Sequence, residues 1–376
     1  MKRILVFGMT EVAGGVESFL MNYYRHMDRQ QLQFDFLCNT HQKIAYENEI
    51  IAMGGKTYHI TARSDNYLIY RKELKTFFST AGKLYDTIWV NVSSLANIDY
   101  LKMAKKYGIS RRIIHSHNSM NMDSKLRGIL HKRNKRNIQK YATDFWACSR
   151  QAADWFYDYS FSSKIVIIKN AVDVKKMEYS TAKRNEKRMQ LHMSFKNQDR
   201  DGMYLVGNVG RLHYQKNQIF LLDVFSEFIK KVPEAKLAFI GKGPDEKKLK
   251  EYVEKLQLTK DVFFLGQQDH IQDWLSAMDI FLFPSLFEGL SIAALEAQAN
   301  GVPILASTEA SPKEIQICPN YFTLSLSESA KQWADLMAEI RQTEKRMEPE
   351  EIIRRFNISG YNITIESEKL YQKLMG

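Results

Sequence analysis

The stretch Phe283–Pro303, FPSLFEGLSIAALEAQANGVP, decides the fold of the second half of the chain. The apolar run 279–284 predicts a buried strand, and the Ala- and Leu-rich run after Gly289 predicts a helix. Asn300-Gly301 is a typical helix stop. A strand that enters a helix through a glycine-containing turn leaves the first helical N–H groups unpaired, and these groups bind phosphate at the positive end of the helix dipole.

Two carboxylates frame this turn. Glu288 lies at its edge, and Glu296 lies about one and a half turns into a helix that begins near Leu290, at ~1.5 Å rise per residue. One extended ligand can therefore contact both carboxylates and the N–H groups between them, because carboxylates accept paired hydrogen bonds from a sugar or ribose diol. The alternative is two surface glutamates, the first placed favourably at the helix dipole.

Glycine-bounded turns precede this stretch. Residues 207–217 read GNVGRLHYQKN, and the turns Ile240–Pro244 (IGKGP) and Phe264–Gln267 (FLGQ) follow. Arg211 and Lys216 come after an expected strand, at the carboxyl end where α/β sheets bind ligands. Both can reach one diphosphate, Arg211 as a fork and Lys216 as a point charge. The alternative is two surface cations that flank a loop.

In this order the elements resemble glycosyltransferase family 4, a large group of retaining enzymes with the GT-B fold. Glu288 and Glu296 match its E-x7-E donor-site signature, and residues 210–216 match its G-R-L-x-x-x-K element. The G-x-G-P and F-x-G turns fall where the family has them. The match runs from about Met203 to Ile315, and the N-terminal half matches more loosely.

The resemblance implies a set of donor-diphosphate ligands. Arg211 and Lys216 would bind the diphosphate, together with the backbone N–H groups of Leu290 and Ser291. Gly14-Gly15 follows the first expected strand and permits close approach of a ligand to the backbone. In the family this loop lies over the donor phosphate, so the resemblance adds Gly15 to the set.

The resemblance also implies contacts to the rest of the donor. Glu288 would contact hydroxyls of the donor sugar, and Glu296 would hold the ribose diol. Gln267 and Gly241, from the two glycine turns, would lie beside the base and the ribose. A pair of carboxylates that flank a glycosidic bond is the arrangement of hydrolases, and only one carboxylate is expected near this sugar. The family's chemistry is instead same-face transfer, in which the leaving phosphate takes the acceptor proton.

Two histidines end the expected strand Arg112–His117. Alternation puts His115 and His117 on one face and Ser116 on the other. A histidine at such a place is more often structural, but the family carries one at the end of this strand, near the donor sugar. His117-Asn118 fits that place better than His115, although the family often has Asp or Thr after its histidine. The resemblance therefore makes His117 a catalytic residue that hydrogen-bonds near the reacting sugar and acceptor; whether it or His115 lines the site stays open here.

The length of 376 residues favours two domains, and 44% hydrophobic with 26% charged residues is a globular composition. Strands and helices alternate, which predicts parallel sheets covered by helices. We expect an α/β chain with the GT-B fold, in which two doubly wound, Rossmann-like domains face a central cleft. The boundaries are 1–170 for the acceptor-side domain, 171–202 for a charged connector, 203–360 for the nucleotide-sugar domain and 361–376 for a helix that packs back on the first domain.

The formal net charge of +11 suits nucleic acid, a membrane surface or anionic substrates. No nucleic-acid-binding motif accompanies it, so we expect no nucleic acid partner. One expected helix crowds its basic residues, which predicts either a solvated face or a patch that rests on anionic lipid head groups. These residues are Lys125, Arg127, Lys132, Arg133, Lys135, Arg136 and Lys140.

The cellular location follows from three features of the sequence. No apolar run is long enough to span a bilayer, and the first residues read as a strand rather than a signal peptide. Cys38, Cys148 and Cys318 lack metal spacing and are expected to be free thiols in a reducing compartment. We therefore expect a cytoplasmic protein, peripheral on the inner face of the cell membrane.

The resulting hypothesis is a retaining hexosyltransferase for bacterial capsule or exopolysaccharide. It would move a sugar from a nucleotide diphosphate sugar, with UDP as the nucleotide, to an undecaprenyl-diphosphate-linked sugar. We expect no cofactor and no metal, because Asp199-Arg-Asp201 lies in the connector rather than at a strand end. The alternatives are a donor-binding partner of another transferase and a GT-B nucleotide-sugar 2-epimerase. A dehydrogenase is excluded because no G-x-G-x-x-G follows the first strand.

Overall fold

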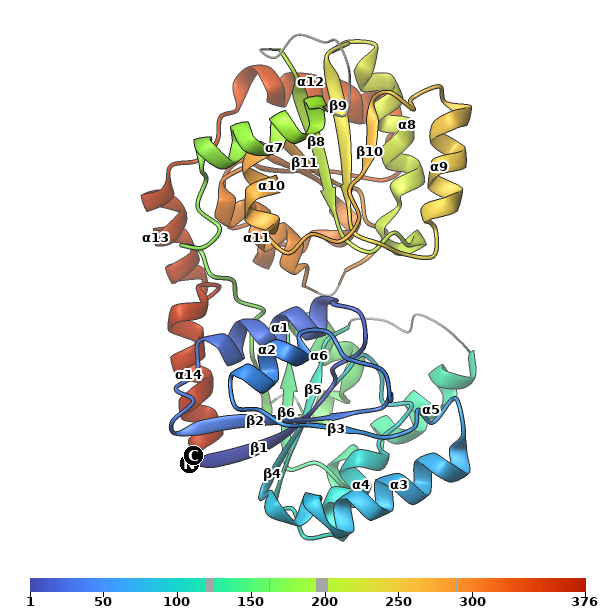
Figure 1. The fold of residues 1–376 in the computed structure, drawn as a ribbon, viewed down its shortest axis with the longest axis vertical. Helices are drawn as coiled ribbons and strands as arrows, with labels where there is room; N and C mark the ends of the chain where they lie inside the picture. Colours follow the sequence, from blue (N-terminus) through green and yellow to red (C-terminus); the bar gives the residue numbers. More distant parts are fainter. Residues whose placement is uncertain (119–124, 162, 194–201, 289) are drawn as a thin grey trace. The chain divides into compact units, whose positions relative to one another are not determined.

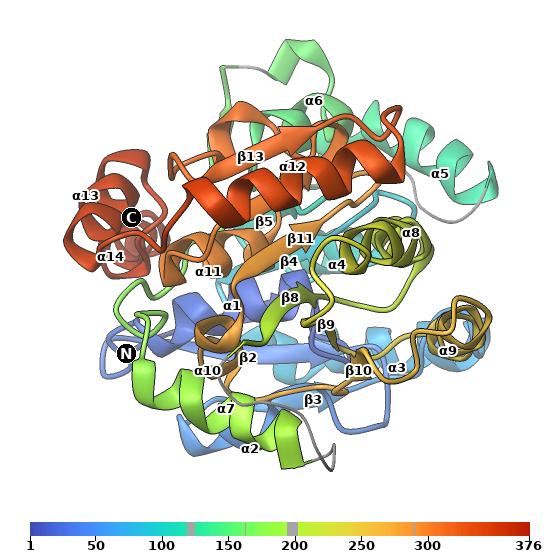
Figure 2. The ribbon, with the colours of Figure 1, turned by 90° about the horizontal axis from the view of Figure 1, so that it is seen from above.

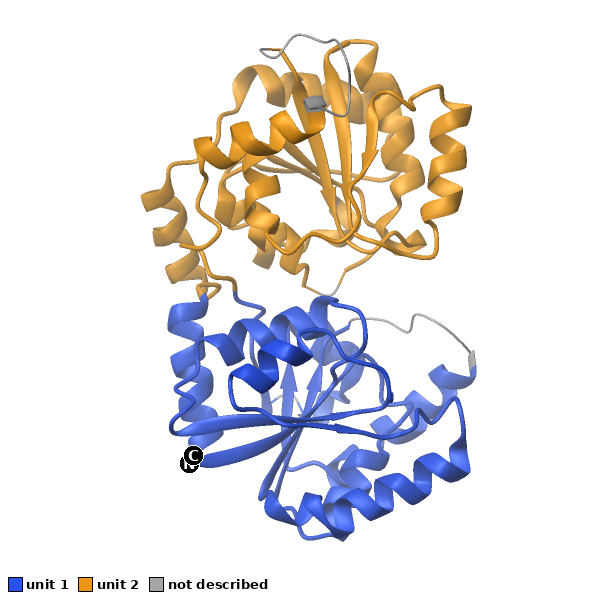
Figure 3. Cartoon of the chain, viewed as in Figure 1, with its two compact units in different colours: residues 1–171, 363–376 blue, residues 172–362 orange. Residues whose placement is uncertain are grey.

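The computed structural model describes residues 1–118, 125–161, 163–193, 202–288 and 290–376. They form two compact units (Figure 3): unit 1 comprises residues 1–171 and 363–376, and unit 2 comprises residues 172–362. Each unit is a parallel sheet with helices on both sides (Figures 1 and 2). The expected pair of doubly wound α/β domains is confirmed.

Unit 1 contains a seven-stranded sheet in the order β3-β2-β1-β4-β5-β6-β7, and every pair in it is parallel. Its strands are β1 (Lys2–Phe7), β2 (Leu32–Cys38), β3 (Thr57–His59), β4 (Thr87–Val92), β5 (Arg111–Ser116), β6 (Asp144–Ala147) and β7 (Ile165–Ile167). Its α-helices are α1 (Gly15–Arg25), α2 (Glu47–Ala52), α3 (Tyr67–Ser79), α4 (Asp99–Lys106), α5 (Lys125–Lys135), α6 (Arg150–Phe156) and α14 (Ile363–Met375).

Unit 2 contains a six-stranded parallel sheet in the order β10-β9-β8-β11-β12-β13. Its strands are β8 (Tyr204–Val209), β9 (Ala235–Ile240), β10 (Val262–Phe264), β11 (Ile280–Phe283), β12 (Ile304–Ser307) and β13 (Tyr321–Leu324). Its α-helices are α7 (Thr181–Met193), α8 (Gln218–Ile229), α9 (Glu246–Lys255), α10 (Ile271–Ala277), α11 (Ile292–Asn300), α12 (Ala330–Thr343) and α13 (Pro349–Ser359).

The central strands are apolar on both faces. All four side chains of β11 (Ile280–Phe283) and residues Ile4, Leu5 and Val6 of β1 have no exposed surface. A parallel sheet covered by helices on both sides requires such continuous apolar runs. The strand order reverses between β1 and β4 in unit 1 and between β8 and β11 in unit 2. Ligands of open α/β sheets bind outside the carboxyl ends of the strands at this reversal, which fixes where a site is expected in each unit.

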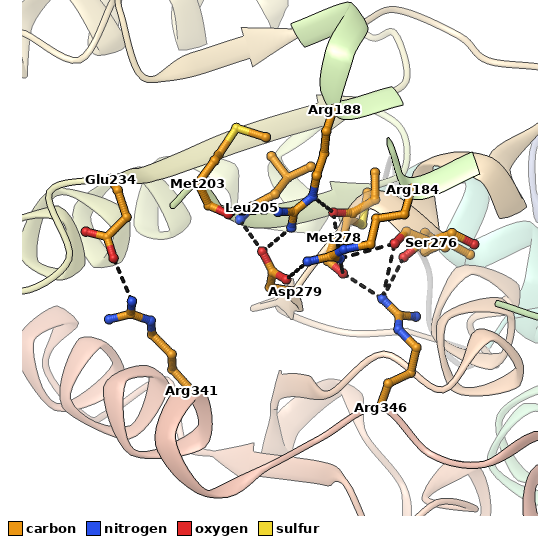
Figure 4. Close-up of polar contacts among 12 residues, drawn as sticks. Arg184, Arg188, Met203, Leu205, Glu234, Ser276, Met278, Asp279, Arg341 and Arg346 are labelled. Atoms are coloured by element: carbon orange, nitrogen blue, oxygen red, sulfur yellow. Dashed lines mark hydrogen bonds and ion pairs between the residues drawn. The ribbon is translucent and has the colours of Figure 1, made fainter. Parts of the chain in front are cut away.

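The charged segment 171–202 differs from the exposed connector expected from its composition. Most of its described part clusters with unit 2, and residues 181–193 form α7, which packs on α10. Arg184 and Arg188 lie one helical turn apart, and both form ion pairs with Asp279 just before β11 (Figure 4). Two of the charged residues of this segment therefore form ion pairs that hold α7 to the rest of unit 2. Residues 194–201 lie outside the described part of the chain.

The C-terminal helix α14 belongs to unit 1, which confirms the expected return of the tail to the first domain. Lys2 Nζ and Arg111 Nη1 both donate to the carbonyl of Leu374, at 2.9 and 3.3 Å. The helix before it, α13, was not expected from the sequence. Its signals are ordinary ones, because Pro349 stands in its first turn and Gly360 ends it with a positive φ of 71°.

Candidate active site

The loop after β8, which borders the strand-order reversal of unit 2, lies against the loop after β9. Gly210 and Gly241 have φ of +153° and +138°, where side chains are rarely tolerated. A Cβ on Gly241 would come within 2.0 Å of the carbonyl oxygen of Gly210. The structure thus gives Gly241 a packing reason within the chain, in addition to the ribose and base contact that the resemblance implies.

Lys216 and Glu288 form the central ion pair of this edge. The distance from Lys216 Nζ to Glu288 Oε1 is 2.7 Å, and the side chains keep only 14% and 9% of their surface exposed. The Lys216 ammonium also lies 5.1 Å from the ring centre of Phe283, at the end of β11. Two residues predicted from separate motifs, 72 positions apart, are therefore brought into direct contact.

Backbone contacts hold the two loops of this pair together. The side chain of Gln215 donates to the carbonyl of Phe287 at 2.9 Å, and the backbone N–H of Leu286 donates to the carbonyl of Gln215 at 2.8 Å. These two bonds fix the loop after β8 to the loop after β11. The ion pair therefore sits on a rigid base rather than on two independent loops.

Helix α11 begins at Ile292, two residues later than expected. Ser291 is its N-cap, with Oγ accepting from the N–H of Ala294 at 3.4 Å. Leu290 and Ser291 therefore precede the first turn and are both buried. Glu296 is four residues after Ile292, which is about one helical turn or ~6 Å along the axis, instead of the expected one and a half turns. Its side chain is partly exposed. Gly301 ends the helix with a φ of 81°, which confirms the predicted stop.

Arg211 and Gln267 are exposed at the same edge of unit 2. The carbonyl of Arg211 accepts from the side chain of Gln218 at 3.1 Å, so its backbone is anchored while its guanidinium faces solvent. Of the two neighbouring glutamines, Gln268 is the anchored one, with bonds to Leu265 and Trp274. The structure leaves Gln267 accessible to a ligand.

In unit 1 the two histidines differ sharply in exposure. His115 has no exposed surface and stacks on Trp89 at 5.9 Å between ring centres, whereas His117 is partly exposed just past the end of β5. Their ring centres are 4.1 Å apart, which confirms that both lie on one face of the strand. Only His117 can touch a ligand, because His115 is covered.

Both histidines are held neutral. Burial lowers the pKa of His117 to about 3, and burial together with the neighbouring His117 lowers the pKa of His115 well below its usual value. His117 Nε2 lies 2.9 Å from Asn91 Oδ1, on β4. A neutral imidazole carries one N–H donor and one acceptor nitrogen, so His117 is suited to hydrogen bonding.

Gly15 is the first residue of α1 and is exposed, and a Cβ there would meet no atom within 4 Å. Nothing within unit 1 therefore requires glycine at this position. The loop before it is shaped by Glu17, which the sequence analysis left without a role. Its carboxylate accepts hydrogen bonds from the N–H and Oγ of Thr10 and from the N–H of Gly14. Burial raises the pKa of Glu17.

A cavity of about 520 Å³ lies at the other end of unit 2, beside Asp279 and Arg346. The Arg346 guanidinium donates to the carbonyls of Leu275, Met278 and Asn300, near the end of α10 and the end of α11. Of these residues, Figure 4 labels Arg346 and Met278. Burial lowers the pKa of Arg346 to about 10. Because the donors of this cluster point into helix-end carbonyls, the cluster fixes α7 and the segment before α13 rather than a ligand.

The chain is similar to known glycosyltransferases. The model of the family described as glycosyl transferases group 1 matches residues 190–356, most of unit 2. The putative glycosyltransferase EpsF of Bacillus subtilis is 28% identical over 90% of this chain and 87% of its own. The structure of Anabaena HepE in complex with UDP and glucose superimposes with a TM-score of 0.80 over the whole of both chains, at 16% identity.

This similarity places residues 190–356 among the group 1 glycosyltransferases. The two sheets of the chain have the GT-B fold, which the structural neighbours share. A further relative in the C-terminal part is the Escherichia coli UDP-Gal:alpha-D-GlcNAc-diphosphoundecaprenol alpha-1,3-galactosyltransferase, 31% identical over 38% of this chain and 36% of that protein.

Of the residues predicted from motifs, Lys216 and Glu288 are in direct contact at the expected edge of unit 2, whereas Gly15 and His117 belong to unit 1. Asn91 and Glu17 of unit 1 were not predicted. Asn91 carries a weak signal in the sequence, since it is the one amide in the apolar strand TIWVNV. Among the described residues, no group of three His, Cys, Asp or Glu side chains is placed to hold a metal ion.

Proposed function

We propose that this glycosyltransferase moves a hexose from a UDP-sugar to a lipid-linked sugar with retention of configuration, as a step in bacterial capsule or exopolysaccharide synthesis. The observation that carries the proposal is the Lys216–Glu288 pair at the strand-order reversal of unit 2, beside the start of α11. The UDP complex of HepE and the UDP-Gal-dependent relative from Escherichia coli support the choice of nucleotide.

The two residues of the pair would bind different parts of the donor. A diphosphate leaving group needs positive charge where its own negative charge develops, and Lys216 with the exposed Arg211 provides it. A sugar hydroxyl needs an acceptor, and Glu288 provides that. Donor binding would break the Lys216–Glu288 ion pair and replace it with two contacts to the donor. The Lys216 ammonium would bind the diphosphate, and the Glu288 carboxylate would accept a hydrogen bond from a sugar hydroxyl. Glu296, four residues into α11, is placed to hold the ribose diol.

The reaction proposed is a same-face displacement. The bond from the anomeric carbon to the phosphate oxygen breaks, the bond from that carbon to the acceptor oxygen forms on the same face, and the acceptor proton passes to the leaving phosphate oxygen. Neither a metal nor a cofactor takes part in this scheme. His117, neutral and partly exposed, hydrogen-bonds a hydroxyl near the reacting centre.

The acceptor proposed is an undecaprenyl-diphosphate-linked sugar, which the protein would meet while peripheral on the cytoplasmic face of the membrane. The support is α5, where Leu126 and Ile129 are 67% and 64% exposed among basic residues. Apolar side chains between cations are what an interfacial helix presents to anionic lipid. No helix in the described part of the chain is long and apolar enough to cross a membrane.

The membrane proposal has a direct test. Replacing Lys132, Arg133 and Arg136 by glutamine should weaken binding to anionic vesicles at least tenfold, since each cation near the surface contributes about 1 kcal/mol. Lys135 is left intact because it donates to the carbonyls of Asp154 and Trp155. The matched control replaces the exposed lysines of α9, Lys247, Lys248 and Lys255. Equal binding by both triple variants would refute a role for α5.

The donor is tested with a panel of UDP-, GDP- and TDP-sugars without added metal, by counting released nucleotide diphosphate with and without lipid-linked acceptor from membranes. Release from one donor that is lost in Glu288→Ala and Lys216→Ala would establish the transferase site. Equal release by wild type and variants would point to a contaminant. No release from any donor, with acceptor present, would favour a donor-binding partner of another transferase.

A further inference from the structure

The ring of His117 is held from three sides within unit 1. Asn91 Oδ1 lies 2.9 Å from Nε2, the ring of Phe19 on α1 meets it edge-on at 4.8 Å between centres, and the ring of His115 lies 4.1 Å away. Within the described part of the chain, the polar contact of this ring is to the side chain of Asn91. It is 2% exposed, so its own orientation is fixed by protein groups rather than by water.

The backbone decides which way the Asn91 amide points. Its Nδ2 lies 3.4 Å from the carbonyl oxygen of Trp89, two residues earlier on β4. The reversed amide would set two acceptor oxygens against each other at that place. The chain after β1 also approaches Asn91 closely, because a Cβ on Gly8 would lie 2.7 Å from the carbonyl oxygen and 2.8 Å from the Cβ of Asn91.

An amide oxygen only accepts hydrogen bonds, so His117 must carry its proton on Nε2 to make this contact. We propose that Asn91 is a positioning residue that fixes His117 as the Nε2–H tautomer and so presents Nδ1 as an acceptor for a hydroxyl of the sugar substrate. The inference rests on the proposed function for its ligand and on the Trp89–Asn91–His117 chain of hydrogen bonds for its geometry.

The Nε2–H tautomer determines which ligand groups can bind at Nδ1 of His117. A nitrogen lone pair accepts from a hydroxyl, whereas it repels a phosphate oxygen, so the Nδ1 position suits the sugar and not the diphosphate. The charges around the ring agree with this. Among the described residues, the ionisable group in contact with the ring is His115, which is neutral. The Glu17 carboxylate on α1 is bound to Thr10 and Gly14. Burial keeps His117 itself neutral, with a pKa of about 3.

The first experiment reads the tautomer without any need for catalysis. Imidazole ¹⁵N spectra of the full chain are recorded at pH 7, and the His117 signals are assigned by their loss in His117→Gln. We expect a protonated Nε2 and an unprotonated Nδ1. A proton on Nδ1, or a doubly protonated ring at pH 6, would overturn the proposal. Because this measurement does not require sugar transfer, its outcome is independent of whether the proposed function is correct.

The second experiment asks whether Asn91 acts through His117. In Asn91→Asp a carboxylate beside Nε2 stabilises the imidazolium, so the pKa of His117 rises and Nδ1 becomes a donor below the new pKa. The rate of donor turnover in this variant should fall at least tenfold more than in wild type between pH 8 and pH 6. Asn91→Leu, which cannot charge the ring, should lose activity equally at both pH values.

The matched control is Asn66→Asp. Asn66 caps α3 through Oδ1, which accepts from the N–H groups of Leu68 and Ile69, and an aspartate makes the same cap. Its pH profile should follow wild type. A pH-independent loss in Asn91→Asp with an unchanged ¹⁵N spectrum of His117 would reduce Asn91 to a packing residue. If Asn91→Asp does not fold, the wild-type spectrum alone decides the tautomer.

Discussion

The two units place opposite kinds of polar group at the carboxyl ends of their sheets. Unit 2 has a charged pair, Lys216 with Glu288, whereas unit 1 has a neutral pair, His117 with Asn91. A charged pair can exchange partners with a diphosphate, and a neutral pair can orient a hydroxyl without attracting or repelling charge. The contrast shows that the same place on two similar sheets can hold a charged pair or a neutral pair, and that each pair suits a different kind of ligand group.

A second contrast lies within unit 2, at the two ends of β11. Asp279 before the strand pairs with Arg184 and Arg188, and Glu288 after it pairs with Lys216 (Figure 4 shows the first cluster). The first cluster is tied to α7 and to helix-end carbonyls, so its charge holds the fold together. The second lies at the strand-order reversal. A cluster of charged residues therefore indicates a ligand site only where it lies at the carboxyl ends of the strands, beside the strand-order reversal.

The largest effect is expected at the Lys216–Glu288 pair. Lys216→Ala and Glu288→Ala should each lower donor turnover about 100- to 1000-fold, because under the proposed function each removes a group that contacts the diphosphate or a hydroxyl of the donor, at about 3–4 kcal/mol in the transition state. Steady-state kinetics on purified variants checks this. Lys231→Ala, which breaks the exposed pair with Asp335, is the control and should keep wild-type turnover.

The next largest effect is expected at Asp279, before β11, and concerns stability rather than turnover. Asp279→Asn should lower the free energy of unfolding of unit 2 by about 3 kcal/mol, because it leaves two largely buried arginines without their carboxylate. The measurement is a urea titration that follows the tryptophans of unit 2. Turnover per folded molecule should stay within about threefold of wild type. A loss of turnover without a loss of stability would place Asp279 in the site and contradict the contrast.

A smaller effect concerns acid stability of unit 1. The pKa of His117 is lowered to about 3 and that of His131 to about 4, below the usual 6.5, because burial disfavours the charged ring. The unfolded chain therefore binds more protons, and stability falls as pH falls below 6.5. Each buried ring should cost about 2 kcal/mol between pH 6.5 and 5, at about 1.4 kcal/mol per pH unit. Urea midpoints of wild type and His117→Gln at these two pH values test it, and His117→Gln should lose less stability than wild type.

The smallest effect is expected at Ser291. Its Oγ accepts from Ala294 at a long 3.4 Å, so Ser291→Ala should cost about 0.5–1 kcal/mol of stability, the low end for an N-cap. Donor affinity should change less than about threefold if the backbone N–H groups, not the hydroxyl, meet the diphosphate. A tenfold loss of affinity would assign the hydroxyl to the donor instead.

The sequence predicted those features that local rules determine. The strand before Pro284, the stop at Gly301 and the place of Lys216 after a glycine-bounded strand each depend on a few neighbouring residues. The Asn91–His117 contact was out of reach, because it depends on the register between β4 and β5, in which Asn91 pairs with His115. The packing of α7 was missed for the same reason: a run of charged residues does not reveal a distant carboxylate such as Asp279.

The most direct test of the assignment of the Lys216–Glu288 pair to the donor is a calorimetric titration of UDP and of the UDP-sugar found in the donor panel, against wild type, Lys216→Ala and Glu288→Ala. The account predicts that Lys216→Ala weakens both ligands by a similar factor. Glu288→Ala should leave UDP binding unchanged or tighter, since the carboxylate no longer competes for Lys216, and should remove only the added affinity of the sugar. Unchanged binding of both ligands in both variants would contradict the assignment of this pair to the donor.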